Sequence, residues 1–348
     1  MERSDPGAAR SPELDGVGVP ASSSGDRPPS TAAGATRRGH PVPGTVWRMA
    51  DGTPSRPFGA VLTAMVTPMG PDGAIDLAAA QHVAATLAAE GHDGLVVSGT
   101  TGESPTTTDA EKDALLRAVV EAVGDRAVVV AGVGTYDTRH SVELAEQAAK
   151  AGADGVLVVT PYYSKPTAAG LLAHFTAVAD ATHLPVILYP HPGRSGAVIE
   201  TETLLRLAEH DRIVAVKDAT GDLWAGSEVM ARTSLAYYSG DDQLNLAWLA
   251  HGAVGVISVV GHVAGPQYAA MVRAVDAGDL PAARAIHNRL LPAVRGLMTR
   301  RMQGAMTVKA ALQLRGTLQH RTMRLPLVAV TDEEVALLRA DLEEAQLL

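Results

Sequence analysis

Short apolar runs alternate with longer stretches of helical period along most of the chain. From Phe58 to about residue 278, runs rich in Val, Leu and Ile are each followed by an Ala-rich stretch with apolar positions three or four residues apart. This alternation is typical of βαβ units. The runs lie at residues 60–67, 94–98, 127–131, 155–160, 185–189, 213–217, 235–239 and 255–259. Eight such runs predict an α/β fold, a closed (β/α)8 TIM barrel.

Three segments repeat one pattern where a helix should give way to a strand. Gly91, Gly152 and Gly252 are each followed three residues later by a second Gly, directly before an apolar run. The first Gly can adopt the left-handed conformation that ends a helix. An open doubly wound sheet is the alternative, but it normally has a Gly-rich dinucleotide loop after its first strand, and residues 65–69 contain no Gly.

Both ends of the chain depart from this pattern. Residues 1–56 are rich in Gly, Pro, Ser, Ala and Asp without a periodic apolar face, so we expect a disordered N-terminal extension, with Met49 as an alternative start. The catalytic barrel should span residues 57–279. Helical periodicity then predicts a small C-terminal all-helical domain, residues 280–348, with helices at 281–290 and 303–314 and a last helix opened by Thr331, with Glu334 at capping-box spacing.

Composition narrows the classes of function. A net charge of -9 offers no broad attraction for phosphate backbones, so nucleic acid is not expected as a partner. The absence of Cys excludes thiolate metal sites and a Cys nucleophile, and the His residues lack paired ligand spacing, so we expect no metal. No apolar run approaches the roughly 18 residues that span a bilayer, and no secretory signal core is present. These features favour a cytoplasmic protein without membrane contact.

The end of the sixth apolar run carries the sharpest chemical signal. Lys217 is one of only five lysines, and it follows four apolar residues where an ammonium group would be poorly solvated. Barrel enzymes place catalytic groups at the C-terminal ends of strands. Burial lowers the pKa of a lysine, by up to about 3–5 units, and the neutral amine can attack a ketone to form an imine. The alternatives are an ion pair with Asp218 or a side chain that reaches solvent.

Other polar residues follow neighbouring runs and should meet at the same mouth. Tyr163 and Tyr189 could relay protons, although a single tyrosine at a strand end more often packs at the rim. Thr100 and Thr101 lie in a Gly-bounded turn whose hydroxyl and N–H groups could hold a carboxylate. Arg194 could clamp a second carboxylate in bidentate fashion, or belong to a surface loop.

The candidate residues belong to sequence motifs that follow one another along the chain. The motifs are Gly-Thr-Thr-Gly-Glu-Ser at 99–104, Thr-Pro-Tyr-Tyr at 160–163, Leu-Tyr-(x)3-Gly-Arg-Ser at 188–195, Val-Lys-Asp-Ala-Thr-Gly at 216–221, Ser-Gly-Asp-Asp at 239–242 and Gly-Val-Ile-Ser at 255–258. Taken in this order, they closely resemble the motifs of the dihydrodipicolinate synthases, within the class I pyruvate aldolase and N-acetylneuraminate lyase superfamily. The likeness extends from about Gly59 to the C-terminus.

The resemblance implies a lyase that condenses pyruvate with L-aspartate 4-semialdehyde to 4-hydroxy-tetrahydrodipicolinate, in the diaminopimelate branch of lysine biosynthesis. Lys217 would form the Schiff base with pyruvate, and this covalent imine would make a cofactor unnecessary. Tyr189 would lie near the imine and move protons. Thr100 and Tyr163 would complete a hydroxyl relay, with Tyr163 donated across a subunit interface.

The same resemblance assigns the substrate-binding residues and the assembly. Thr101 would hold the pyruvate carboxylate, Arg194 would receive the carboxylate of the semialdehyde, and the backbones of Gly240 and Ile257 would line the pocket. Family members are commonly homotetramers built as dimers of dimers, and we expect the same assembly for this chain.

Two departures from the family pattern affect these expectations. Pro190 and His191 follow the strand-five tyrosine, where relatives commonly carry Asn or Asp and then an apolar residue. Lysine-inhibited relatives line an interface pocket with His, Asn and Glu. The matching positions in this chain are Asp109, Lys112, Tyr136 and His140. Because these residues differ from that set, we expect weak or absent inhibition by lysine.

Two other functions compete with this interpretation. A sister aldolase that cleaves a sialic or keto-deoxy sugar acid would share the barrel, the lysine and the tyrosine, but Arg194 favours a small carboxylated aldehyde. A barrel that has lost catalysis could instead serve as a ligand-binding regulator, since a fold does not guarantee activity. The presence of Lys217, Tyr189, Thr100 and Tyr163 argues against that loss.

Overall fold

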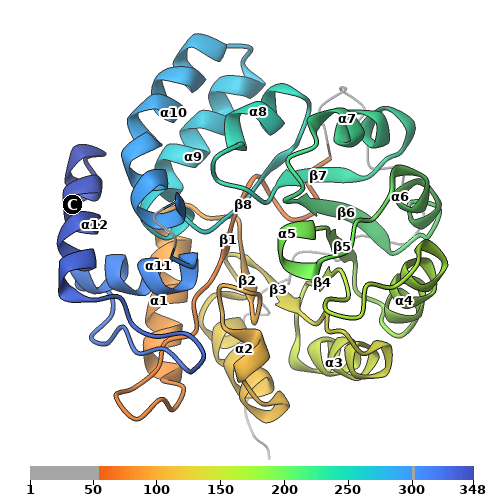
Figure 1. The fold of residues 1–348 in the computed structure, drawn as a ribbon, viewed down its shortest axis with the longest axis horizontal. Helices are drawn as coiled ribbons and strands as arrows, with labels where there is room; N and C mark the ends of the chain where they lie inside the picture. The colour runs from red at the N-terminus through yellow and green to blue at the C-terminus, as the bar shows by residue number, and fades with distance from the viewer. Residues whose placement is uncertain (1–54, 300–301) are drawn as a thin grey trace, which may run out of the picture. The chain divides into compact units, whose positions relative to one another are not determined.

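Eight parallel strands close into a barrel in chain order, as the alternation predicts. The computed structural model describes residues 55–299 and 302–348, so the expected disordered extension, residues 1–56, lies outside the described residues except for its last two. In Figure 1 the strands occupy the centre and the helices surround them. The strands are β1 (Val61–Ala64), β2 (Gly94–Val97), β3 (Val128–Gly132), β4 (Gly155–Val159), β5 (Val186–Tyr189), β6 (Ile213–Asp218), β7 (Ala236–Ser239) and β8 (Gly255–Ser258).

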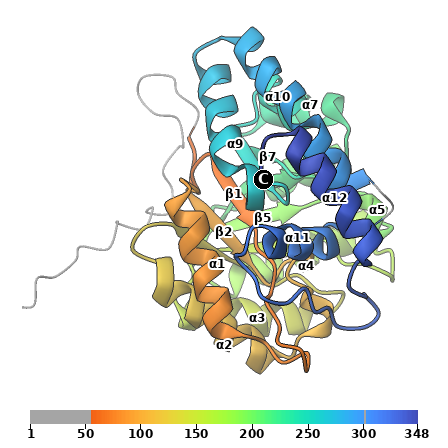
Figure 2. The ribbon, with the colours of Figure 1, turned by 90° about the vertical axis from the view of Figure 1, so that its left-hand side faces the viewer.

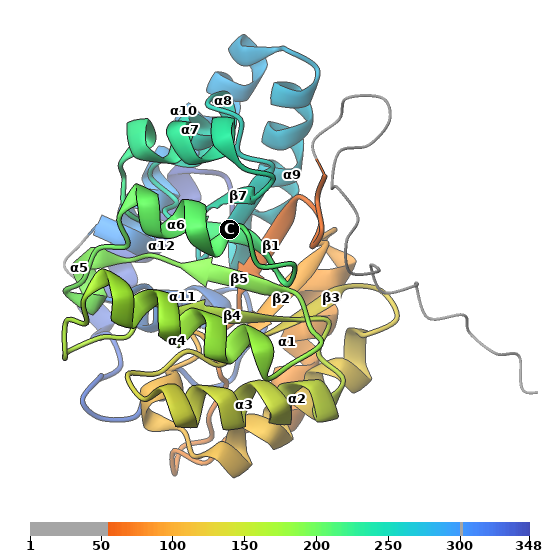
Figure 3. The ribbon, with the colours of Figure 1, turned by 90° about the vertical axis from the view of Figure 1, so that its right-hand side faces the viewer.

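Asp and Thr side chains begin most of the helices that follow the strands. Asp76, Thr108, Asp137, Thr167 and Asp222 each accept a backbone N–H from the first turn, which satisfies a donor that has no partner within the helix. Neighbouring helices pack side by side around the barrel, as α3, α4 and α6 do in Figure 3. The helices are α1 (Leu77–Ala89), α2 (Asp109–Val123), α3 (Thr138–Ala151), α4 (Ala168–Asp180), α6 (Thr201–Leu207), α7 (Leu223–Arg232), α8 (Asn245–Ala250) and α9 (Gly261–Asp276), with the short η1 (Ser104–Thr106) and α5 (Pro192–Ser195) in loops.

The repeated Gly pattern marks the ends of helices, as predicted. Gly91, Gly152 and Gly252 have φ angles of 90°, 89° and 109°. Residues with a Cβ seldom adopt this left-handed region, whereas Gly does so at little cost. Each Gly therefore turns the chain from a helix toward the next strand.

Two apolar cores hold the barrel together. One lies between the strands and the surrounding helices, and the other fills the barrel interior with residues such as Leu62, Val96 and Ile257, all of which are fully buried. Burial of each such side chain contributes about 1.5–3 kcal/mol. Within the interior core, the hydroxyl of Tyr238 donates to the carbonyl of Gly59 at 3.0 Å, so this buried polar group is satisfied.

The first strand is shorter than the apolar run that predicts it. β1 ends at Ala64, whereas the run continues to residue 67. The N–H of Val66 donates to Nε2 of His262, at 3.1 Å, instead of to a neighbouring strand. A histidine from α9 thus takes the backbone donor of Val66, and its position 196 residues away gives no local signal in the sequence.

Helices dominate the end of the chain. α10 (Leu280–Val294) runs into a π-turn, Arg295–Thr299, and α11 (Gly304–Leu314) and α12 (Asp332–Glu344) follow. Thr331 and Glu334 form both hydrogen bonds of the predicted capping box. α12 packs against α10 and α11, and α11 contacts α9 (Figure 2). None of the helices in the described part of the chain has the length and apolarity that a membrane-spanning segment needs.

Candidate active site

The C-terminal ends of β2 to β5 open into a cavity of about 250 Å³. This is the end of a barrel at which enzymes of this fold place their active sites. Among the predicted residues, Thr100, Tyr189 and Arg194 line the cavity. The other lining residues are Ser98, Gly99, Ser104, Pro105, Gly132, Gly134, Leu157, Val159, Tyr162, Ser195 and Gln303.

Lys217 lies in β6 with its amine held against an aromatic ring. Its side chain is buried, and Nζ is 4.2 Å from the centroid of the Tyr189 ring. Burial lowers the pKa of Lys217, the carboxylate of Asp242 partly opposes this, and the positive charge of Arg194 adds to it, which leaves the pKa at about 8. A substantial fraction of the amine is therefore neutral near pH 8, the form that attacks a carbonyl.

Tyr189 ends β5 and faces both Lys217 and the cavity. Burial raises the pKa of Tyr189 to about 12, and the negative charge of Asp241 adds to this, whereas Arg194 and a hydrogen bond with the side chain of Thr100 lower it. The phenol therefore keeps its proton at neutral pH and can donate it. The contact with Thr100 joins the two hydroxyls that the sequence predicts to work together.

Asp242 joins the loop after β7 to the end of β8 and acts electrostatically on Lys217. Its carboxylate accepts hydrogen bonds from the hydroxyl of Ser258 and, at 2.8 and 3.0 Å, from the backbone N–H groups of Val259 and Val260. The side-chain amide of Asn245 donates to it at 3.0 Å. These donors satisfy a buried negative charge, which would otherwise be costly.

Arg194 lies in the short helix α5 and is held by His191. Its Nε–H donates to Nε2 of His191 at 3.1 Å. Burial, together with the positive charges of Arg194 and Lys217, lowers the pKa of His191 to about 4. The imidazole is therefore neutral at physiological pH and can accept this hydrogen bond.

Three predicted binding residues, Thr101, Gly240 and Ile257, are not part of the cavity wall. Thr101 and Ile257 are buried, and Ile257 belongs to the core inside the barrel. Gly240 abuts Lys217, because a Cβ at this position would lie 2.9 Å from Cγ of the lysine. A larger residue at position 240 would therefore displace the lysine stem.

The two tyrosines after β4 lie in different environments, one at the cavity and one in solvent. Tyr162 lines the cavity and packs edge-to-face against Tyr136, with ring centroids 5.4 Å apart. Tyr163 is 93% exposed and has a φ angle of 74°. Within a single chain, the structure thus does not bring Tyr163 to the other predicted catalytic groups.

Several cavity residues carry little signal in the sequence. β3 ends at Gly132, and Gly134 lies two residues later; a Cβ at Gly134 would lie 2.3 Å from the backbone nitrogen of Val159, so Gly allows the chain to pass close to β4 beside the cavity. Their position after the third apolar run could have identified them as mouth residues. Gln303 comes from the C-terminal helical region, and nothing in its local sequence connects it with the barrel mouth.

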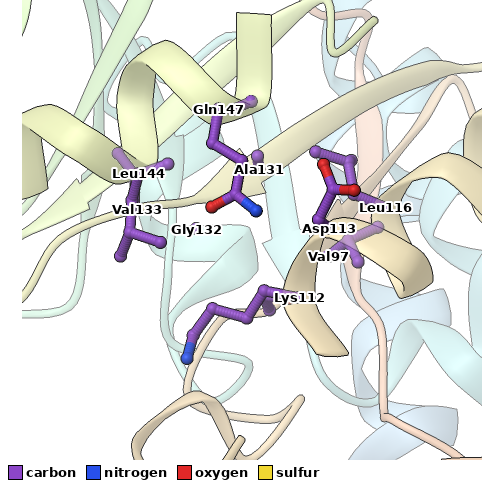
Figure 4. A pocket seen from close by; sticks show the side chains of 11 residues that line it. Val97, Lys112, Asp113, Leu116, Ala131, Gly132, Val133, Leu144 and Gln147 are labelled. Atoms are coloured by element: carbon purple, nitrogen blue, oxygen red, sulfur yellow. The ribbon is translucent and has the colours of Figure 1, made fainter. Parts of the chain in front are cut away.

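Of the four positions that the family resemblance assigns to a lysine pocket, only Lys112 borders a second, smaller cavity. Between α2 and α3 lies a cavity of about 20 Å³, enough for about one water molecule, and Lys112 is part of its wall. In Figure 4 the Lys112 ammonium points away from the Asp113 carboxylate; it donates to the carbonyl of Thr107. Nε2 of His140 lies 3.0 Å from Oδ2 of Asp109.

Metal-ligating side chains do not gather at the cavity. Within residues 55–299 and 302–348, no group of three or more His, Asp or Glu side chains is placed to hold a metal ion.

Comparisons with known proteins agree with this geometry. A family model described as the dihydrodipicolinate synthetase family matches residues 57–345. The chain is 67% identical to a 4-hydroxy-tetrahydrodipicolinate synthase of Kineococcus radiotolerans over 84% of this chain and 95% of the relative.

Solved structures give the same result. A dihydrodipicolinate synthase of Bacillus anthracis has a TM-score of 0.79 and 42% identity, over 82% of this chain and 98% of that one. The enzyme of Cyanidioschyzon merolae, solved with lysine bound, has a TM-score of 0.81 and 41% identity, over 84% and 99% of the two chains. The fold, the arrangement of the cavity and these similarities together establish that the chain belongs to the dihydrodipicolinate synthetase family.

Proposed function

We propose that the protein is a lyase that condenses pyruvate with L-aspartate 4-semialdehyde to 4-hydroxy-tetrahydrodipicolinate in the diaminopimelate branch of lysine biosynthesis, through an imine on Lys217. The relatives at 53–67% identity carry the name of this activity. The observation that supports the imine is the buried amine of Lys217, 4.2 Å from the Tyr189 ring centroid at the C-terminal end of the barrel.

The first stage joins pyruvate to the lysine. The neutral amine of Lys217 attacks the keto carbon, and the carbinolamine loses its hydroxyl as water to give the imine. Tyr189, protonated at neutral pH, donates the proton that the departing hydroxyl needs, and Thr100 shares this proton through its hydrogen bond. Thr101 and the adjoining backbone of the turn hold the pyruvate carboxylate.

The second stage forms the new carbon–carbon bond. Loss of a methyl proton converts the imine to an enamine, whose carbon attacks the aldehyde carbon of the semialdehyde. The guanidinium of Arg194 binds the carboxylate of this second substrate. The substrate's own amino group then displaces Lys217 from the imine carbon and closes the ring, which returns the lysine amine.

We further propose a homotetramer in which Tyr163 acts in the site of a neighbouring subunit. A tyrosine that is 93% exposed, directly beside a cavity residue, is placed to reach another chain. Mixing two inactive variants tests this proposal. Tyr163→Phe and Lys217→Ala subunits, mixed after mild dissociation, should regain activity, because a hybrid interface supplies both groups; no regain would contradict donation between subunits.

The proposal includes no metal and no cofactor other than the covalent imine, with activity in the cytoplasm. Exhaustive treatment with a chelator should therefore leave turnover unchanged. Activity that is lost and then restored by a divalent cation would contradict this part of the proposal.

Borohydride trapping with pyruvate tests the central step. Reduction should fix one pyruvyl group on Lys217, which blocks tryptic cleavage there and leaves residues 213–232 as one modified peptide. Lys217→Ala should give no adduct, and the exposed Lys150→Ala should trap pyruvate normally as the matched control. Turnover with aspartate semialdehyde then identifies the synthase. An adduct without this turnover indicates a sister aldolase, and the absence of an adduct contradicts the proposed chemistry.

A further inference from the structure

A continuous series of contacts links the imine site to the arginine of the second carboxylate. Nζ of Lys217 lies over the Tyr189 ring, and this ring packs edge-to-face against His191, with centroids 5.9 Å apart and planes at 68°. The imidazole in turn accepts the Nε–H of Arg194 at 3.1 Å. His191 is thus the only link of this series to which the proposed reaction assigns no part.

We propose that His191 is a positioning residue: its Nε2 fixes the Arg194 guanidinium so that the two terminal nitrogens receive the carboxylate of the aldehyde substrate. This inference rests on the proposed function. It adds that one side chain, His191, orients the arginine that binds the second substrate. An arginine that binds a carboxylate through its two terminal nitrogens leaves Nε free for such an acceptor.

The geometry around His191 supports a defined orientation. The imidazole packs edge-to-face with the buried Tyr189 ring, and a Cβ at Gly193 would lie 3.5 Å from Cε1 of the imidazole, so the ring lies against both Tyr189 and the backbone of α5. Nδ1 is buried and has no hydrogen-bond partner within the described residues. Nε2 is therefore the nitrogen with which the neutral ring makes its hydrogen bond.

Arg194 needs such a partner because the rest of its side chain is poorly restrained. The residue is exposed, and in the described part of the chain its guanidinium makes no other hydrogen bond. A free arginine side chain loses about 2 kcal/mol of rotamer entropy when it is fixed. A histidine that holds Nε before the substrate arrives lowers this entropic cost of binding.

The contact can be removed without loss of the local backbone. The N–H groups of Arg194 and Ser195 both donate to the carbonyl of His191, at 2.9 Å, so the turn does not depend on the imidazole. His191→Leu removes the acceptor. His191→Gln places an amide oxygen near the position of Nε2 and serves as the conservative rescue.

The test compares the KM values for the two substrates in steady-state kinetics. His191→Leu should raise the KM for aspartate semialdehyde about tenfold, the loss expected for one hydrogen bond to a charged group, and leave the KM for pyruvate and borohydride trapping unchanged. His191→Gln should restore most of the loss. Equal changes in both KM values, no change in either, or a Gln variant as impaired as the Leu variant would overturn the inference.

A second measurement requires neither turnover nor a substitution of His191. In protein labelled with 15N-arginine, the Nε–H signal of Arg194, assigned by its loss in Arg194→Lys, should exchange slowly with solvent. Exchange as fast as that of exposed arginines would overturn the inference. Because this measurement uses no substrate, failure of the inference is distinguishable from failure of the proposed function.

Discussion

The ammonium group of Lys309 and the carboxylate of Glu103 form an ion pair that joins α11 to the loop after β2. Both side chains are almost inaccessible, at 0% and 1% exposure. Lys309 also donates to the carbonyl of Thr322 at 2.7 Å, and Glu103 accepts the backbone N–H of Arg324 at 3.0 Å. Since Glu103 closes the turn that carries Thr100, the C-terminal helical region holds one wall of the cavity in place.

Lys309→Met should destabilise the protein strongly. The substitution leaves the Glu103 carboxylate buried without its cation, which typically lowers the free energy of unfolding by about 3–5 kcal/mol. Urea denaturation measures the loss, and the addition of Glu103→Gln should recover part of it. Arg339→Met, which breaks an exposed 3.9 Å pair with Glu343, is the matched control and should cost less than about 1 kcal/mol. A comparable loss in the two single variants would contradict this account.

Tyr189→Phe should impair chemistry without preventing the binding of pyruvate. The ring that faces Lys217 remains, but the proton donor is lost, so kcat should fall by about 10²–10⁴. The KM for pyruvate should change little. Tyr237→Phe provides the control, since the Tyr237 hydroxyl is also buried but has no hydrogen-bond partner among the described residues and does not line the cavity. An unchanged kcat in Tyr189→Phe would remove Tyr189 from the proposed relay.

The sequence was sufficient to predict the barrel and the position of its mouth. Parallel strands buried on both faces produce continuous apolar runs, and the residues after those runs meet at one end. The sequence alone therefore assigns four residues to this end of the barrel: Lys217, Tyr189, Thr100 and Arg194.

Contacts between residues far apart in the sequence, and differences between neighbouring residues in loops, could not be predicted in the same way. The pair formed by Glu103 and Lys309 spans 206 residues, and no local pattern encodes it. Tyr162 and Tyr163 are neighbours, yet only Tyr162 lines the cavity, while Tyr163 has a left-handed backbone and is exposed. The contact of His191 with Arg194 depends on a four-residue helix too short to have a readable period.

Stability should fall as the pH drops from about 6.5 to about 4. Burial lowers the pKa of both His174 and His262 to about 4, so the unfolded chain takes up protons before the folded chain does. Above pH 6.5 these histidines are neutral in both the folded and the unfolded chain, so they do not change the free energy of unfolding. Below pH 6.5, each buried histidine lowers the free energy of unfolding by up to about 3 kcal/mol. Protonation of His262 would also break the hydrogen bond from Val66.

Chemical denaturation at a series of pH values tests this expectation. His262→Gln keeps an acceptor for Val66 but cannot take up a proton, so it should reduce the slope of stability against pH. His183→Gln, at an exposed position, serves as the control. A slope in His262→Gln equal to that of the unmodified protein would exclude His262 as a source of the acid sensitivity.

Lysine should inhibit the enzyme weakly or not at all. Among the positions that the family resemblance assigns to an effector pocket, Lys112 has its Nζ 3.8 Å from Asp109, and His140 contacts the same carboxylate. A lysine effector would meet a like charge and compete with these contacts, and an approach of two unit charges to about 4 Å costs roughly 1–4 kcal/mol. Steady-state assays should give half-maximal inhibition only above about 1 mM lysine, which corresponds to less than about 4 kcal/mol of binding free energy.

Lys112→Gln removes the charge and should increase the sensitivity to lysine, with Lys150→Gln as the control at an exposed position. Submillimolar inhibition of the unmodified enzyme would show that these residues form a working lysine site despite their charge.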